Sequence, residues 1–358
     1  MNGARRASVL AVAACLCACD HATDLADYRL VVAGGRSQVS DLYIVNGNGR
    51  IMQRITETPD RAETWPLWTP DGARIYYESR ETADRTLSLR AFDLTRRTDE
   101  LVYGPVSPGE LWCAISPDGT KLAHVTKDSM LGQLVLRDMR TGEVQPMARP
   151  GERLLRPEWA QDSRRLLCQA KLSRQSPWDL VIVDTATGDR QSLGGAPDTT
   201  EFKGRWSPDG QSIVFSVAGK SGRGTVGLEI LALETGSRTK LSPGMDERVV
   251  SGAWSPRGVM AALRERPKPM SILLWPDTTT PGVRHTIQLD ERLNRGRLVW
   301  SPDGRYLALN ARGKTRPGRG DWRVIIFDHA GNKVREWPRK MQMFCPAWAS
   351  HTPADAAS

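Results

Sequence analysis

The sequence predicts an all-β protein, a seven-bladed β-propeller of four-stranded blades, with six blades as the alternative. One motif, Trp-Ser-Pro-Asp-Gly or a near variant, recurs along the chain and precedes a short apolar strand. Its first position, called here the Trp slot, recurs every 44 to 48 residues, at Trp68, Ile115, Trp159, Trp206, Trp254, Trp300 and Trp348. A period in this range is typical of propellers and other stacked repeats. The 32 glycines and 23 prolines also fit many short strands joined by turns.

Each repeat carries the signals of four strands. The first strand runs into the Trp slot, and the second follows the turn, as at 213–217 (IVFSV). A third apolar run ends at an acidic or amide residue, as at 180–184 (LVIVD), and a polar turn leads to a short fourth strand, as at 190–193 (RQSL). Four strands per repeat make one propeller blade.

The motif has a structural reason at every position. Proline presets φ at the first corner of a tight turn, Asp bonds back to the backbone, and Gly accepts a positive φ. The Trp is large enough to fill the gap between neighbouring twisted sheets. We therefore predict that the motif residues hold blade against blade and take no part in catalysis.

Trp-Ser-Pro-Asp-Gly followed by a strand, at this period, resembles the WD-repeat-like propeller of the TolB type, which also occurs in dipeptidyl peptidases and prolyl oligopeptidases. The resemblance covers roughly residues 28–350. It implies the fold and says little about function. TolB carries a separate domain ahead of its propeller, and residues 20–27 are too short to be one, so no role in the Tol system is carried over.

The two ends of the chain are predicted to build one blade together. Six complete repeats start at the slots from Trp68 to Trp300, which leaves one strand at 343–349 and three strands within 28–56. One strand plus three makes a seventh blade. Such closure removes the open sheet edges that otherwise pair with other chains. The predicted boundaries are 28–350 for the propeller and 351–358 for a disordered tail.

The first 18 residues predict a signal peptide, followed by a tether at 19–27. Arg5 and Arg6 precede an apolar run of twelve residues, too short for a membrane span, which needs about 20. Residues 16–19 (LCAC) resemble the lipobox of bacterial lipoproteins, which makes Cys19 the predicted lipidation site. Cys15 is a competing position, and an ordinary cleaved signal is the alternative. The predicted location is the bacterial cell envelope, with a lipid anchor in the inner or outer membrane and the propeller facing the periplasm.

The search for catalytic motifs finds none. There is no Gly-x-Ser-x-Gly elbow, and the five histidines lack ligand spacing, so we expect no cofactor and no metal. The acid pairs 246–247 and 290–291 are expected to lie in surface loops. Cys113, Cys168 and Cys345 are expected to be buried free thiols, because an odd number remains once Cys19 is lipidated.

The candidate binding site is the column three residues before each Trp slot. It reads Trp65, Trp112, Arg156, Lys203, Ser251, Arg297 and Cys345. Seven equivalent positions form a ring about the axis, and strand alternation predicts that they face away from the slot. The ring would set two tryptophans beside an arc of three cations.

Aromatic faces and guanidinium groups together suit an acidic glycan or an acidic protein segment. The net charge of +9 agrees with an acidic partner and equally with a solvated surface. We therefore expect a monomeric binding module that recognises an envelope protein or acidic glycan and no nucleic acid. The alternative is a glycan-active enzyme, lyase-like or hydrolase-like, with an unrecognised site.

Overall fold

The structure is a computed structural model that describes residues 24–349, except for short segments at 37–38, 108–110, 127–132, 172, 174–175, 177, 196–198, 220–225, 242–246, 277, 279–284, 291–292, 314–320 and 338–341. The predicted signal peptide, Cys19 and the tail at 351–358 lie outside the described residues. No helix in the described part of the chain is long and apolar enough to cross a membrane.

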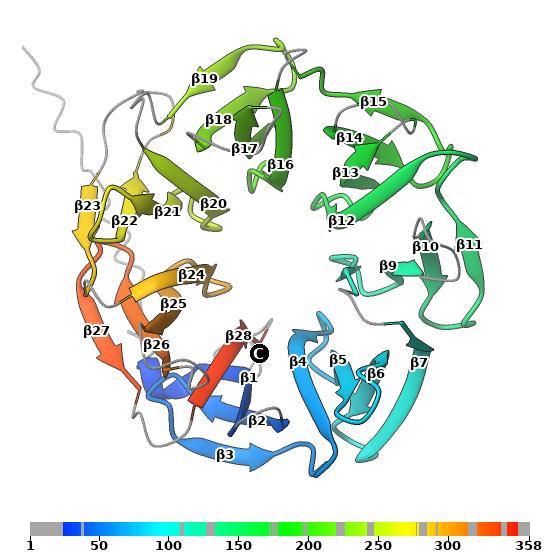
Figure 1. The fold of residues 1–358 in the computed structure, drawn as a ribbon, viewed down its shortest axis with the longest axis vertical. Coiled ribbons are helices and arrows are strands. Elements are labelled where there is room, and N and C mark those ends of the chain that lie inside the picture. The colour runs from blue at the N-terminus through cyan, green and yellow to red at the C-terminus, as the bar shows by residue number, and fades with distance from the viewer. Residues whose placement is uncertain are drawn as a thin grey trace, which may run out of the picture.

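The described strands form five sheets, three of four strands and two of eight, set around a central axis (Figure 1), which confirms the all-β propeller. In each eight-stranded sheet a single parallel bridge, between β2 and β4 or between β18 and β20, joins two antiparallel four-stranded units. Each antiparallel four-stranded unit is called a blade here. Blade 1 contains β28 (Gln342–Trp348), β1 (Arg29–Arg36), β2 (Val39–Asn46) and β3 (Ile51–Arg54). Blade 2 contains β4 (Arg61–Trp68), β5 (Arg74–Glu81), β6 (Leu87–Asp93) and β7 (Thr98–Val106). Blade 3 contains β8 (Cys113–Ile115), β9 (Lys121–Thr126), β10 (Gln133–Asp138) and β11 (Val144–Pro146). Blade 4 contains β12 (Arg153–Trp159), β13 (Arg165–Lys171), β14 (Asp179–Asp184) and β15 (Arg190–Ser192).

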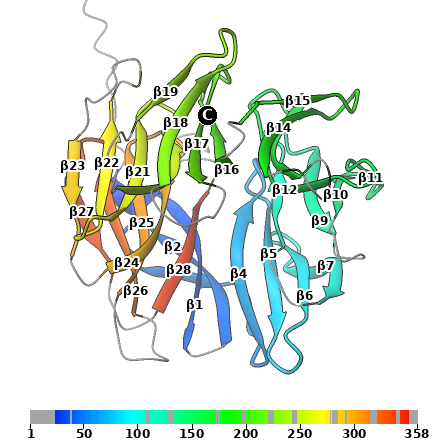
Figure 2. The same cartoon turned by 45° about the horizontal axis from the view of Figure 1, so that its top comes forward.

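The other three blades follow the same order. Blade 5 contains β16 (Thr199–Trp206), β17 (Ser212–Gly219), β18 (Val226–Ala232) and β19 (Arg238–Lys240). Blade 6 contains β20 (Arg248–Trp254), β21 (Met260–Arg266), β22 (Ser271–Trp275) and β23 (His285–Gln288). Blade 7 contains β24 (Leu293–Trp300), β25 (Tyr306–Gly313), β26 (Asp321–Asp328) and β27 (Lys333–Glu336). The first strand of each blade lies nearest the axis, and the strands run through the thickness of the ring (Figures 1 and 2).

The ring is closed by the C-terminal strand, as predicted. β28 pairs antiparallel with β1, from Leu30 opposite Trp348 to Gly35 opposite Gln342. Residues 25–27, placed in the tether by the sequence, form a 3-10 turn, and the side chain of Leu25 is buried in the apolar cluster between blades 7 and 1. Among the described residues, Leu25 is therefore already part of the packed structure.

The slot tryptophans join neighbouring blades, as the motif predicts. In five blades the indole N–H donates to the carbonyl oxygen of the residue just before the slot of the preceding blade, over 3.0–3.2 Å. The pairs are Trp68 with Ala347, Trp159 with Ala114, Trp206 with Glu158, Trp300 with Ala253 and Trp348 with Val299. The apolar core also lies between blades. One cluster, for example, joins Leu167 and Leu180 of blade 4 to Trp206 and Phe215 of blade 5.

The motif turns are held by a hydroxyl and a carboxylate. The Ser207 hydroxyl donates to Asp209, and the Thr69 hydroxyl donates to Asp71 over 2.6 Å. These hydrogen bonds lower the pKa of both carboxyl groups. The motif Asp residues are therefore ionised structural groups of the turn.

Candidate functional site

A β-bulge shapes the predicted binding column. Trp65, Arg156, Lys203 and Cys345 have φ between +52° and +55°, in the left-handed region that non-glycine residues rarely occupy. The pairing of the first strand with the second shifts by one residue at each of these places. Strict alternation, which the sequence predicted there, is therefore wrong at these four positions, because the extra residue turns the side chain to a new direction.

The residue after the column explains why the strand bulges. It is proline at 66, 157 and 346 and glycine at 204 and 252. A Cβ at Gly204 would lie 2.7 Å from Leu167 Cδ2 of the preceding blade, so that position leaves no room for a side chain. Proline and glycine inside a strand mark bulges and close backbone approaches. The proline or glycine after the column is therefore the sequence signal for the bulge.

Four of the predicted ring residues meet in two aromatic–cation pairs. The guanidinium carbon of Arg156 lies 4.9 Å from the ring centroid of Trp112, and that of Arg297 lies 5.2 Å from the ring centroid of Trp65. The first pair joins blades 3 and 4, and the second joins blades 2 and 7 across blade 1. Both arginines are exposed, and Trp65 is 46% exposed. Of the three cations in the predicted arc, Arg156 and Arg297 thus stack on the two tryptophans, and Lys203 is half-buried on β16.

A further arginine at the centre was missed by the sequence argument. Arg205 directly precedes the slot Trp206, where five other repeats carry an alanine, leucine or valine. Desolvation, and then the charges of Arg297 and Arg156, lower the pKa of Arg205 to about 10. Desolvation is also the largest cause that lowers the pKa of Arg297. The charges of Arg156 and Arg297 therefore reach Arg205, and Glu158 forms an ion pair with Arg205.

Buried polar residues on second strands hold the surrounding backbone. Glu78 on β5 accepts a hydrogen bond from the N–H of Leu111 over 3.1 Å, and the Oδ1 atom of Asn310 on β25 accepts one from the N–H of Cys345 over 3.3 Å. Both side chains are 4% exposed. They fix the segments that carry Trp112 and the bulge at Cys345.

The cysteines in the described part of the chain are free thiols, as predicted, although only Cys168 is fully buried. Desolvation is the main cause that raises the pKa of Cys113 to about 12 and that of Cys345 to about 11. Both thiols therefore stay protonated at neutral pH, where a thiolate would be needed for nucleophilic attack.

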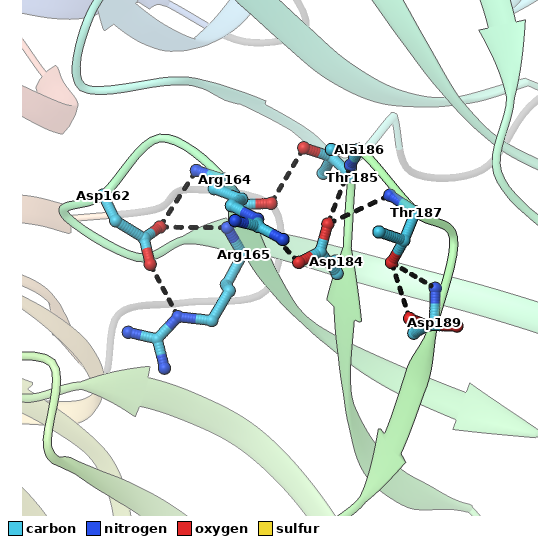
Figure 3. Close-up of polar contacts among 8 residues, drawn as sticks. All are labelled: Asp162, Arg164, Arg165, Asp184, Thr185, Ala186, Thr187 and Asp189. Atoms are coloured by element: carbon cyan, nitrogen blue, oxygen red, sulfur yellow. Dashed lines mark hydrogen bonds and ion pairs between the residues drawn. The ribbon is translucent and has the colours of Figure 1, made fainter.

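Acidic side chains near the turns are engaged in local structure. In blade 4, Asp162 accepts hydrogen bonds from the N–H groups of Arg164 and Arg165, and Asp184 accepts hydrogen bonds from the turn that follows β14 (Figure 3).

Of the two predicted acid pairs, 246–247 and 290–291, residues 246 and 291 lie outside the described residues. Glu247 forms an ion pair with Arg264 over 3.5 Å, and Asp290 forms one with Arg323 over 3.2 Å. No group of three or more His, Cys, Asp or Glu side chains suited to a metal ion occurs among the described residues.

Comparison with known proteins places the fold. No family model matches the chain. A curated protein described as uncharacterized peptidase YuxL, from Bacillus subtilis (strain 168), is 30% identical over 109 residues, which are 29% of this chain and only 16% of that protein.

Among solved structures, TolB from Acinetobacter baumannii covers 90% of this chain and 83% of its own, with 17% identity and a TM-score of 0.54. A manganese complex of oligogalacturonate lyase covers 78% and 82%, with 16% identity and a TM-score of 0.58. A prolyl endopeptidase covers 90% of this chain and 51% of its own, with 12% identity and a TM-score of 0.64. At these identities the likeness establishes the fold alone, and this chain has a TolB-like β-propeller fold.

Proposed function

We propose that this protein is a monomeric binding module of the bacterial cell envelope, which captures an acidic ligand at the centre of the propeller. A lipid on Cys19 would tether it to a membrane, facing the periplasm, and the ligand would be an envelope protein or an acidic glycan. The observation that carries the proposal is the stacking of Arg156 and Arg297 on Trp112 and Trp65, with the positive charge of Arg205 nearby.

Stacking prepares the guanidinium groups for a carboxylate. A guanidinium stacked on an indole can also form a bidentate hydrogen-bonded pair with a carboxylate. Its rotamer is already restricted, so less entropy is lost when a ligand binds. The like charges of Arg156, Arg205 and Arg297 repel one another, and an anion between them would relieve that repulsion.

The experiment compares two charge-matched variants of the purified protein. The central variant is Arg156→Asn with Arg297→Gln, and asparagine is chosen because it tolerates the left-handed backbone of residue 156. The control is Arg97→Asn with Arg85→Gln, which removes two charges from turns of blade 2 that also have positive φ. Binding of an Asp/Glu-rich peptide and of oligogalacturonate is measured by calorimetry.

Loss of charge-assisted hydrogen bonds should weaken binding roughly 10- to 100-fold in the central variant. The control should bind within about twofold of the parent, since its arginines lie in the turns between β5 and β6 and between β6 and β7, outside the predicted column. Equal affinities for the central variant and the parent would refute the proposal.

A glycan-active enzyme is the second candidate function. It is favoured by the likeness in fold to the oligogalacturonate lyase over 78% of this chain. Incubation with acidic oligosaccharides, followed by chromatography of the products, separates the two candidates, because chain cleavage would support the enzyme.

The tether has a separate test. If Cys19 carries the lipid, Cys19→Ala should abolish incorporation of radiolabelled palmitate. Equal labelling of this variant and the parent would exclude Cys19 as the anchor.

A further inference from the structure

Exposed apolar side chains gather at one place on the outer rim of the ring. Six large apolar side chains are exposed among the described residues, and three of them, Ile51, Met52 and Val334, lie on the outermost strands of two neighbouring blades. Ile51 and Met52 begin β3 of blade 1, and Val334 is the second residue of β27 of blade 7. These strands follow one another along the rim (Figure 1). We call the three residues the rim patch, and grouped apolar side chains of this kind mark a contact surface where scattered ones do not.

The turn between β2 and β3 joins the two strands of the rim patch. The indole N–H of Trp337, which directly follows β27, donates to the carbonyl oxygen of Gly47 over 2.9 Å. Arg335 Nε donates to Asn48 Oδ1 over 3.1 Å. A Cβ at Gly49 would lie 2.6 Å from Trp337 Cγ, so the turn is packed directly on the indole. The rim patch therefore belongs to two blades that are held together at this point.

The first described residues of the chain pack against the same turn. The N–H of Gly47 donates to the carbonyl oxygen of Tyr28 over 3.0 Å, and a Cβ at Gly47 would meet the carbonyl oxygen of Leu25. Asp24 is only five residues after Cys19. Five residues span at most about 18 Å when fully extended. A lipid on Cys19 would therefore hold the rim patch close to the surface of the bilayer.

The charges around the rim patch balance one another. Arg50 is exposed next to the patch, but the exposed carboxyl groups of Asp24 and Asp27 lie at the start of the described chain. Lys333 forms an ion pair with Glu336 over 2.6 Å. No single sign of charge prevails here, so attraction to anionic head groups is not what distinguishes this surface. The apolar side chains suit the interface of a bilayer, where they can reach the boundary of the acyl chains.

Three side chains are too few to bind a membrane by themselves, and the tether changes this balance. A short tether keeps the patch at a high effective concentration beside the lipid, so a weak contact is made without a further loss of translational freedom. Under that condition the lipid anchors the protein, and the patch determines its orientation.

We propose that the rim patch is a membrane-contact surface, which lies on the bilayer when a lipid on Cys19 is inserted. The ring then stands on the edge formed by blades 7 and 1, and both ends of its central axis face the periplasm. An acidic ligand could reach the centre of the propeller in this orientation. This inference rests on the tether of the proposed function and adds the surface that orients the protein.

The test measures contact with lipid on the full lipoprotein in vesicles of phosphatidylethanolamine and phosphatidylglycerol. A photoreactive benzoylphenylalanine replaces Met52 in one preparation and Val334 in another. The matched control carries it in place of Val144, which begins the outermost strand β11 of blade 3 and is 45% exposed, against 53% for Met52. β11 lies on the other side of the ring from β3 and β27 (Figure 1).

Crosslinks to lipid at positions 52 and 334 should exceed those at 144 by about fivefold or more, because only the rim patch enters the interface. High salt should leave the yields unchanged, since the contact is apolar. Ile51→Ser with Met52→Ser should lower the yield from position 334 by about threefold or more, whereas Val144→Ser should not change it. Equal yields at 52, 334 and 144 would mean that the ring lies flat or turns freely, and would overturn the membrane-contact surface.

Palmitate labelling of the same samples separates this inference from the proposed function. A protein that carries palmitate and gives equal yields keeps its tether and loses the membrane-contact surface. A protein without palmitate that gives no lipid crosslinks at any position overturns both. Binding of acidic ligands at the centre is measured separately by calorimetry, and neither result changes it.

Discussion

Two buried carboxyl groups show how burial between blades changes the pKa of a side chain. Glu63 and Glu201 both lie five residues before a slot tryptophan, and they are 0% and 1% exposed. Glu201 forms an ion pair with Arg238. Glu63 accepts a hydrogen bond from the Thr58 hydroxyl over 3.0 Å, and its Oε2 atom has no hydrogen-bond partner among the described residues. Burial is the main cause that raises the pKa of Glu63 to about 7.

This pKa predicts that Glu63 makes stability fall as pH rises. The unfolded chain releases the proton at the ordinary carboxyl pKa near 4.5, while the folded protein keeps it up to about pH 7. Stability is therefore lost between these values, by up to about 3 kcal/mol. Glu63→Gln should be more stable than the parent at pH 8 by roughly that amount and nearly equal to it at pH 4.5.

Urea unfolding at several pH values measures the difference. Glu143→Gln, at an exposed position on the polar turn before β11, is the control and should follow the parent throughout. A pH dependence of Glu63→Gln that matches the parent would show that Glu63 ionises without cost in the folded state.

At the scale of the element, the first strand of a blade combines a left-handed residue with a small or cyclic one. The pairs Trp65–Pro66, Arg156–Pro157 and Lys203–Gly204 follow this pattern. The second residue lets the strand approach the preceding blade, and the bulge directs the first residue into the ring. Packing of the blades and the direction of the side chains at 65, 156 and 203 therefore depend on the same distortion.

Gly204→Ala should destabilise the protein by about 1–3 kcal/mol, the usual cost of overpacking a core. The new Cβ would meet Leu167 Cδ2 at 2.7 Å and Leu180 Cδ1 at 3.0 Å. The matched control is Gly219→Ala at the end of β17, where a Cβ would meet nothing within 4 Å. Equal urea midpoints for the two variants would mean that Leu167 and Leu180 of blade 4 move aside without a loss of unfolding free energy.

For the whole molecule, β28 connects three blades. It pairs with β1 within blade 1, its Trp348 indole N–H donates to Val299 of blade 7, and its Ala347 carbonyl accepts from Trp68 of blade 2. Tyr28 packs edge-on against Trp348, with ring centroids 5.7 Å apart. The last strand therefore holds the ring closed on both sides.

A chain that ends at Arg339 should lose most of its stability. Burial of Trp348 alone contributes roughly 3–5 kcal/mol, and typical domains are stable by only about 5–15 kcal/mol. A chain that ends at Ala349 keeps the whole strand and serves as the control. Thermal unfolding of the chain ending at Arg339 within a few degrees of the control would contradict the closing role of β28.

The sequence by itself determined the repeat, the turn chemistry, the packing role of the slot tryptophans and the closure by β28. These are predictable because each repeat encodes them locally, and local signals at a constant period permit few arrangements. The column three residues before the slot also follows from the repeat, and its role as a binding site stays a prediction.

Only the tertiary structure decided which side chains meet. Arg297 reaches Trp65 across blade 1, and Arg205 joins the central cations from a position that the column did not include. The curvature of the closed ring brings these residues together, and the spacing of residues in the sequence does not predict these contacts. The bulge likewise follows from the close approach of Gly204 to Leu167 in another blade. Contacts between repeats depend on how the blades pack, so they are settled only when the ring is complete.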